Sequence, residues 1–216
     1  MKQEHHEIKS SQQNDDLRKK IEDTLFTAHS LFTRGKVSGS SANISFRHGD
    51  IVYISGSGTC FGTLKESDLI PISMTGCALF SGKPSKEWPL HIQLYQKSSD
   101  IQAVIHTHSL YCVLWSFVPI QNETDVIPPH TPYLQMKLGK VGFIPYEKPG
   151  TERLFQAFRD RIANSDGFIL KNHGPVVPGK SMLDAFFNLE ELEESARVAW
   201  ELYRAGLHLP LQERPQ

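Results

Sequence analysis

An apolar strand that ends in two histidines dominates the middle of this chain. The run Ala103–Ile105 is apolar and rich in β-branched residues, which is typical of the buried part of a strand. The run leads into His106, and His108 follows two positions later. Alternate side chains of a strand share a face, so the two imidazoles are expected to point the same way. Two imidazoles on one rigid element form half of a transition-metal site.

The composition is that of an ordinary soluble protein. Its 216 residues suffice for one good core, which favours a single domain over two small ones. The net charge is -1 and no basic block is present, so a nucleic-acid partner has no electrostatic support. The three cysteines, Cys60, Cys77 and Cys112, are widely spaced, which favours free thiols in a reducing compartment. Without a signal-peptide pattern or a membrane-length apolar run, we expect a cytoplasmic protein with no membrane partner.

Hydrophobic periodicity and turn residues divide the chain into helices and strands. Helices are expected at about 15–35, 85–95, 109–117, 151–162 and 181–205. Strands are expected at 42–47, 51–55, 103–106, 141–146 and 167–170, and the first two form a hairpin. The order is a helix, a hairpin, and then helices and strands in turn, which is not a regular parallel alternation. It predicts an α/β sandwich with a mixed, largely antiparallel central sheet.

The ends of the chain set the expected domain boundaries. Residues 1–14 are polar, so we expect a disordered N-terminal tail there, followed by one domain over 15–206 and a C-terminal tail over 207–216. The last expected helix contains the acidic run Glu190, Glu191, Glu193 and Glu194, which is interpreted as a solvated face.

Two further residues are candidates to complete the metal site. His173 lies between an expected strand and Gly174, where a tight turn can expose its ring, and Glu87 lies in the first turn of an expected helix. Three imidazoles and one carboxylate satisfy Zn²⁺ or a similar divalent ion. Other histidines compete: His91, one helical turn after Glu87, could be a core residue or support the ligands from behind, and His130 lies in the proline-rich loop. A lone histidine near a turn, or a lone glutamate in a first helical turn, is more often structural.

A second group of residues has the character of an anion site. The segments 39–43 and 55–59 are loops of small residues that flank the hairpin, and their N–H groups could form a nest for a phosphate. Ser85 and Lys86 stand at a helix N-terminus, which favours anions, and Lys86 adds a full positive charge. Neither loop matches a P-loop or a dinucleotide fingerprint.

Together these stretches resemble the class II aldolase/adducin family over residues 17–204. The matching stretches, in the family's order, are Gly39-Ser-Ser-Ala-Asn43, Ser57-Gly58, Pro84-Ser-Lys-Glu87, His106-Thr-His108 and Asn172-His-Gly174. Within the family the chain is most similar to the 3-oxo-tetronate 4-phosphate decarboxylases, through the segments 58–62, 82–87, 131–133, 144–150, 172–177 and 189–194. Fuculose-phosphate-type aldolases usually carry serine where this chain has Lys86, which favours the decarboxylase.

The resemblance implies an α/β/α enzyme that binds Zn²⁺, or Mn²⁺ or Co²⁺ in its place. It is expected to form a homotetramer with active sites at subunit interfaces. The implied metal ligands are His106, His108 and His173, with Glu87 as an acid/base that can also bind the metal. The implied phosphate-binding residues are Asn43, Ser57, Gly58, Ser85 and Lys86. Tyr133 occupies the place of the family's proton-donating tyrosine, supplied by a neighbouring subunit, and Tyr146 is the nearby alternative.

The implied reaction is the decarboxylation of a 3-oxo-tetronate 4-phosphate to dihydroxyacetone phosphate and CO₂ through a metal-stabilised enediolate. A sugar-phosphate aldolase passes through the same enediolate, so an aldolase or epimerase remains the alternative. Adducin-type relatives keep the fold without the chemistry, which leaves a non-catalytic binding module as a further alternative. A metal-binding structural protein is disfavoured by the small-residue loops and Lys86.

Overall fold

The computed structural model describes residues 2–207, with side chains from Gln12 onward. The helices are α1 (Lys2–Thr33), α2 (Trp88–Lys97), α3 (Leu110–Trp115), α4 (Tyr133–Lys137), α5 (Glu152–Arg159) and α6 (Met182–Arg204). The strands are β1 (Asn43–His48), β2 (Ile51–Ser55), β3 (Leu69–Ser73), β4 (Ala103–His106), β5 (Val141–Ile144), β6 (Gly167–Leu170) and β7 (Gly174–Gly179). Short 3-10 turns cover Phe61–Thr63, Glu66–Asp68 and Ile162–Asn164.

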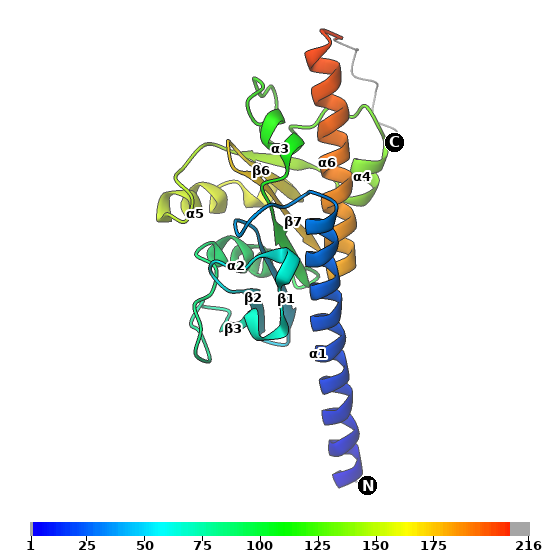
Figure 1. Ribbon diagram of the computed structural model, residues 1–216, viewed down its shortest axis with the longest axis vertical. Coiled ribbons are helices and arrows are strands. Elements are labelled where there is room, and N and C mark those ends of the chain that lie inside the picture. The colour runs from blue at the N-terminus through cyan, green and yellow to red at the C-terminus, as the bar shows by residue number, and fades with distance from the viewer. Residues whose placement is uncertain (1, 208–216) are drawn as a thin grey trace.

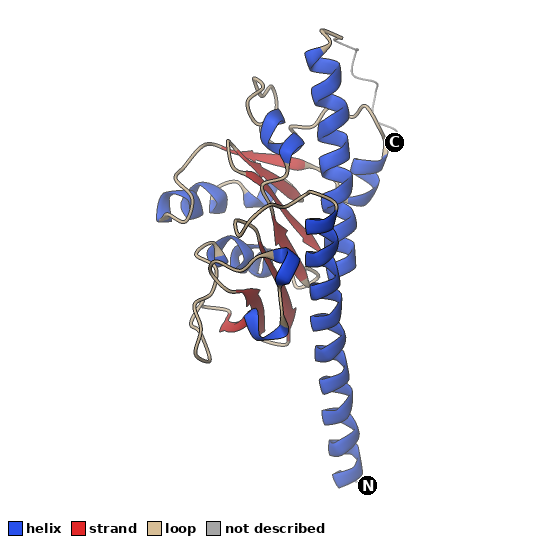
Figure 2. Cartoon of the chain, in the orientation of Figure 1, coloured by secondary structure: helices blue, strands red, loops and turns tan. Residues whose placement is uncertain are grey.

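One seven-stranded sheet in the order β3-β2-β1-β4-β7-β6-β5 forms the centre of the molecule (Figure 2). Every neighbouring pair is antiparallel except β5 and β6, which are parallel. The prediction of a mixed, largely antiparallel sheet is therefore confirmed. β4 lies between β1 and β7, so the strand that carries His106 is shielded on both edges.

Helices cover both faces of the sheet and create two hydrophobic cores. One face packs against α1, α3, α4 and α6, and the other packs against α2 and α5. The alternation is visible in β6, where Ile169 belongs to the first core while Phe168 and Leu170 belong to the second. Figure 1 shows α1 beside α6 on one side of the sheet, with the N-terminal part of α1 running past it. This is the expected α/β/α sandwich.

Two strands escaped prediction because each contains proline. β3 carries Pro71 at its centre, and this is tolerated because β3 is the outermost strand. β7 carries Pro175 and Pro178, yet it lies inside the sheet between β4 and β6. The Pro175 carbonyl accepts from the Thr107 N–H at 3.3 Å, so the strand contributes acceptors where it lacks donors.

The ends of the first two helices differ from the sequence expectation. α1 begins at Lys2 rather than near Asp15, so the structure shows helix over residues 2–14, where disorder was predicted. No glycine or proline interrupts these residues, so nothing local breaks the helix. α2 begins at Trp88, and Glu87 rather than Ser85 occupies the N-cap position. Of the predicted C-terminal tail, residues 208–216 lie outside the described residues.

Other local predictions are confirmed. Thr151 caps α5 by accepting from the Leu154 N–H, and Ser181 caps α6 by accepting from the Asp184 N–H. Pro89 lies in the first turn of α2, where its missing N–H leaves no bond unmade. No helix within residues 2–207 is both long and apolar enough to cross a bilayer.

The interpretation of the acidic run on α6 as a solvated face is wrong for Glu193. Its side chain is buried and accepts from the Tyr111 and Cys112 N–H groups, both at 3.0 Å, at the N-terminus of α3. A carboxylate at this position satisfies two orphan donors and favours the helix dipole. The adjacent Glu194 is exposed and pairs with Arg197, as predicted for a solvated face. The buried carboxylate of Glu193 therefore fixes the helix that follows His108.

We predict that Glu193→Ala destabilises the fold by about 2 kcal/mol, because two buried N–H groups lose a charged acceptor. Glu194→Ala is the matched control and should leave stability nearly unchanged, since its ion pair is exposed. Urea unfolding of both variants measures the difference. Equal stability losses for the two variants would contradict the assigned capping role.

Candidate metal centre

The two histidines of the strand are held at the end of β4. His106 is its last residue and is fully buried, and His108 follows before α3 and is exposed. The His106 Nδ1–H donates to the Pro175 carbonyl at 2.8 Å. This bond fixes the tautomer, so the lone pair of Nε2 faces the neighbouring histidines.

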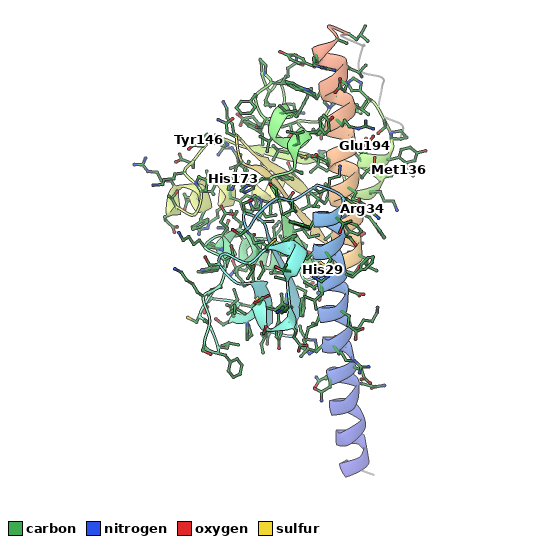
Figure 3. The ribbon with its side chains drawn as sticks, in the orientation of Figure 1. His29, Arg34, Met136, Tyr146, His173 and Glu194 are labelled. Atoms are coloured by element: carbon green, nitrogen blue, oxygen red, sulfur yellow. The ribbon has the colours of Figure 1, made fainter. Side chains whose placement is uncertain are left out.

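The third histidine comes from a different pair of strands but lies close to the first two. His173 lies in the turn between β6 and β7, and its Nε2 is 3.2 Å from His106 Nε2. One ligand atom from each of His106, His108 and His173 lies within 4.8 Å of the others. Figure 3 shows His173 at the edge of the sheet where its strands end. The structure therefore brings together the three histidines that the sequence proposed as ligands.

The turn that carries His173 depends on two unusual backbone positions. Asn172 has a positive φ of 56°, and its N–H donates to Ser116 Oγ at 2.9 Å. Gly174 has a φ of 147°, and a Cβ built there would overlap the Thr107 carbonyl oxygen and lie 3.0 Å from His108 Cα. Only glycine lets the backbone after His173 approach the backbone of the paired histidines so closely.

Glu87 completes the cluster from α2. It is 8% exposed, its Oε2 lies 3.2 Å from His106 Nε2, and its Oε1 lies 3.4 Å from His173 Nε2. Oε1 has no hydrogen-bond partner among the described residues. Imidazole nitrogens and a carboxylate oxygen that converge on one point are the donor set of a divalent transition metal. The residues present therefore fit a metal ion, as the sequence predicted.

The electrostatics of the cluster suit a cation. Burial, reinforced by the neighbouring His106, lowers the pKa of His108 to about 4 and that of His173 to about 3. Neutral imidazoles with free lone pairs are the form that binds a metal. Burial alone would raise the pKa of Glu87, but His106, His173 and Asn43 together hold that pKa at about 2. The carboxylate is therefore ionised, which is the form that binds a metal.

One of the two predicted anion loops, 55–59, lies beside the segment that carries Ser85 and Lys86. The Ser57 N–H donates to the Lys83 carbonyl at 2.8 Å, and the Ser85 N–H donates to the Ser55 carbonyl at 3.1 Å. These bonds join the loop after β2 to the segment before α2. Gly58 has a positive φ of 83° and is exposed, as are Ser57 and Lys86. The Ser57 hydroxyl, the Gly58 N–H and the Lys86 ammonium remain for a ligand, whereas the Ser57 N–H is already used.

Two predicted ligand-binding residues have partners within the protein. Ser85 is buried, and its Oγ accepts from the Glu87 N–H at 3.3 Å. Asn43 is the first residue of β1, opposite His106 in the sheet, and its Nδ2 donates to Glu87 Oε2 at 3.3 Å. The Asn43 side chain thus touches the metal centre directly, and its second N–H is left for a substrate.

The candidate tyrosines lie apart from each other. Tyr133 begins α4, which packs with Leu134 and Leu138 on the face of the sheet opposite to α2, and its ring is 58% exposed. Figure 3 shows Met136 of the same helix well separated from His173. Tyr146 follows β5 and is also exposed. Within one chain Tyr133 does not join the histidine cluster, so its proposed role requires a neighbouring subunit.

Sequence reasoning left the inner neighbours of Glu87 unassigned. His91 was expected as a core residue or a support behind the ligands, Tyr95 as apolar helix surface, and Ser45 had no expected role. All three form a buried chain that ends at Asn43. A signal was present: His91 is one helical turn after Glu87, and Ser45 is two strand positions after Asn43. Each pair therefore shares one face of its element. His130 lies in a separate loop, and no ligand group that includes it is found within residues 12–207.

The comparisons with known proteins define the class. The family model for the class II aldolase and adducin N-terminal domain matches residues 22–200, and the chain belongs to this family. It is 38% identical to the 3-oxo-tetronate 4-phosphate decarboxylase of Escherichia coli K12, over 81% of this chain and 83% of that protein. It is also 38% identical to the L-fuculose phosphate aldolase of Methanocaldococcus jannaschii, over 78% and 88%.

A solved structure agrees with this placement. The crystal structure of YgbL from Klebsiella pneumoniae superposes with a TM-score of 0.82 at 34% identity, covering 86% of this chain and 90% of that one. An L-fuculose 1-phosphate aldolase superposes with a TM-score of 0.78 at 24% identity and shares the fold. The seven-stranded sheet with its covering helices is thus the class II aldolase fold.

We predict that Gly174→Ala weakens metal binding by about 10- to 100-fold, because the added Cβ forces His173 away from His108. Metal content after dialysis and calorimetric titration with Zn²⁺ measure this loss. Gly206→Ala is the control for positive-φ strain, since a Cβ there meets no atom within 4 Å. Unchanged affinity in the Gly174 variant would show that the close approach does not position the ligands.

Proposed function

We propose that this chain is a metal-dependent carbon–carbon lyase that converts a 3-oxo-tetronate 4-phosphate to dihydroxyacetone phosphate and CO₂. The observation that carries the proposal is the convergence of Glu87, His106, His108 and His173 beside two loops suited to a phosphate. Support comes from the relatives: 3-oxo-tetronate 4-phosphate decarboxylases of E. coli and Haemophilus influenzae are 38% and 36% identical to this chain.

The three histidines would hold the metal, with Glu87 as a fourth ligand or as an acid/base. Zn²⁺ is the ion that the donor set favours, and Mn²⁺ or Co²⁺ could replace it. When bound, such a cation supplies Lewis-acid stabilisation of negative charge on the substrate ketone. The tautomer of His106, fixed by Pro175, keeps one nitrogen directed at the ion.

The remaining steps belong to side chains of this chain. Ser57, Gly58, Ser85, Lys86 and the second N–H of Asn43 would hold the phosphate and so orient the substrate. Loss of CO₂ transfers the C1–C2 bonding pair into the adjacent ketone and forms an enediolate. One proton must then be added at C2 to give dihydroxyacetone phosphate.

Two groups are candidates to deliver that proton. The first is Tyr133, which would come from the neighbouring subunit of a homotetramer whose active sites lie at subunit interfaces. The second is Glu87, acting through a water. We also propose a cytoplasmic location, since the three cysteines are free thiols in the structure.

A sugar-phosphate aldolase or epimerase is the alternative, because the archaeal fuculose phosphate aldolase is as similar in sequence as the decarboxylases. Both reactions need the same stabilised enediolate, so the metal centre is compatible with either reaction and does not distinguish between them. A non-catalytic adducin-like role is disfavoured by the complete set of convergent ligands.

We predict that the purified protein releases CO₂ and dihydroxyacetone phosphate from one enantiomer of 3-oxo-tetronate 4-phosphate. His108→Ala should remove bound metal and nearly all turnover, yet retain the fold because His108 is exposed. Coupled assays of both enantiomers, with fuculose 1-phosphate as the competing substrate, measure the choice. Aldehyde release from the sugar phosphate without CO₂ would establish the aldolase instead, and full activity in metal-free protein would refute the metal role.

We predict that Lys86→Ala raises KM for the phosphorylated substrate about 10- to 100-fold, since one charge-assisted contact to phosphate is lost, with a smaller effect on kcat. Lys83→Ala is the matched control, because Lys83 is also exposed but contributes only its backbone carbonyl to the loop contact. Steady-state kinetics separate the two variants. An unchanged KM in the Lys86 variant would remove Lys86 from the anion site.

A further inference from the structure

A buried chain of polar side chains runs inward from the metal centre. Asn43 Nδ2 contacts Glu87 Oε2 at 3.3 Å, and Asn43 Oδ1 contacts His91 Nε2 at 2.6 Å. His91 Nδ1 then contacts Ser45 Oγ at 2.7 Å, and Ser45 Oγ contacts the Tyr95 hydroxyl at 2.7 Å. These inner side chains, from β1 and α2, are at most 3% exposed. None of His91, Ser45 and Tyr95 has a place in the proposed reaction.

The chemistry of these groups permits only one direction of donation. A carboxylate accepts, so Asn43 must present its N–H₂ to Glu87 and its carbonyl oxygen to His91. The carbonyl oxygen accepts, so His91 must carry its proton on Nε2. His91 Nδ1 is then the acceptor for the Ser45 hydroxyl, and the Ser45 oxygen accepts from Tyr95. A buried imidazole whose partners are an amide and a hydroxyl is neutral, which this pattern requires.

The flipped orientation of the Asn43 amide is unfavourable because of its contact with Glu87. If the Asn43 amide were flipped, its carbonyl oxygen would face Glu87 Oε2 at the distance of the present 3.3 Å contact. Two acceptors with no proton between them repel in a site shielded from water. The flip would be stable only if His91 offered an acceptor instead of a donor at Nε2. The Glu87 carboxylate on one side and the His91 Nε2–H on the other therefore hold the Asn43 amide in one orientation.

We propose that His91 is a positioning residue that, through Asn43, holds the Glu87 carboxylate in the orientation needed at the metal centre. Asn43 holds Oε2, and this leaves Oε1, which has no hydrogen-bond partner among the described residues, directed at His173. Ser45 fixes the tautomer of His91, and Tyr95 fixes the Ser45 hydroxyl. The inference rests on the proposed metal-dependent function and adds a residue that never touches the substrate.

Two histidines of the site should therefore hold opposite tautomers. His106 is protonated on Nδ1, since it donates to the Pro175 carbonyl, whereas His91 is protonated on Nε2. Nitrogen-15 NMR of the histidine side chains in the wild-type chain distinguishes the two forms directly. An Nδ1–H tautomer at His91 would overturn the proposal, and this measurement needs neither substrate nor a variant.

Variants test whether the donor matters or only the packing. His91→Leu removes the donor, so we expect Co²⁺ affinity and kcat each to fall about 10- to 100-fold, with KM for the phosphorylated substrate changed less than about twofold. His91→Gln restores an N–H donor to Asn43 and should recover most of both losses. The control is His29→Leu, an exposed histidine on α1, whose ring bonds only the Leu64 carbonyl. It should behave as wild type.

The outcomes separate the inference from the function on which it rests. Equal impairment of His91→Leu and His91→Gln would indicate a packing role and overturn the positioning role. A folded His91→Leu variant with wild-type Co²⁺ affinity would do the same. If His91→Leu does not fold, Ser45→Ala, which frees the tautomer and barely changes packing, should show a partial loss, and its absence would count against the proposal. Failure of the wild-type chain to bind Co²⁺ would instead refute the metal centre itself.

Discussion

The pairing of β4 with β7 is the interaction on which the site depends. It places His106 opposite Val176 and lets the Pro175 carbonyl accept from the His106 ring. The same pairing brings the turn that carries His173 over the end of β4, where Gly174 allows the two backbones to touch. An antiparallel pair of strands, far apart in sequence, thus supplies all three imidazoles from one rigid edge. Rigid placement matters because a metal site tolerates little error in ligand position.

The carboxylate of the cluster comes from outside the sheet and needs its own support. Glu87 occupies the N-cap position of α2, and the segment before that helix is tied to β2 through Ser85. On its inner side, Asn43 and the chain behind it restrain one oxygen of the carboxylate. The proposed anion loop 55–59 is joined to the same segment, so the acid/base group and the phosphate site share one anchor. A substrate held by its phosphate would thereby be oriented relative to Glu87.

The chain is 38% identical both to a protein named as a decarboxylase and to one named as an aldolase. Overall sequence identity therefore does not distinguish between the two reactions. Discrimination must come from groups that touch the rest of the substrate, such as Lys86 and the small-residue loops. It must also come from the proton donor, which the position of α4 assigns to a neighbouring chain if it is Tyr133. Fold and metal ligands therefore set the class of chemistry, and the surrounding loops set the substrate.

The sequence by itself placed His106 and His108 on one face, because alternate side chains of a strand point the same way, and it named His173 and Glu87 as the candidates that the fold brings beside them. It also predicted the sheet class and the starts of α5 and α6 near residues 151 and 181, which depend on neighbours within a few residues. It missed β3 and β7, since proline argues against a strand unless the paired partner is known.

Only the tertiary structure decided that Glu193 caps α3 and that the Asn43 side chain donates a hydrogen bond to Glu87 rather than leaving both of its N–H groups for a substrate. A buried polar group takes its role from whichever donors the fold brings near it, and those donors come from elements distant in the chain.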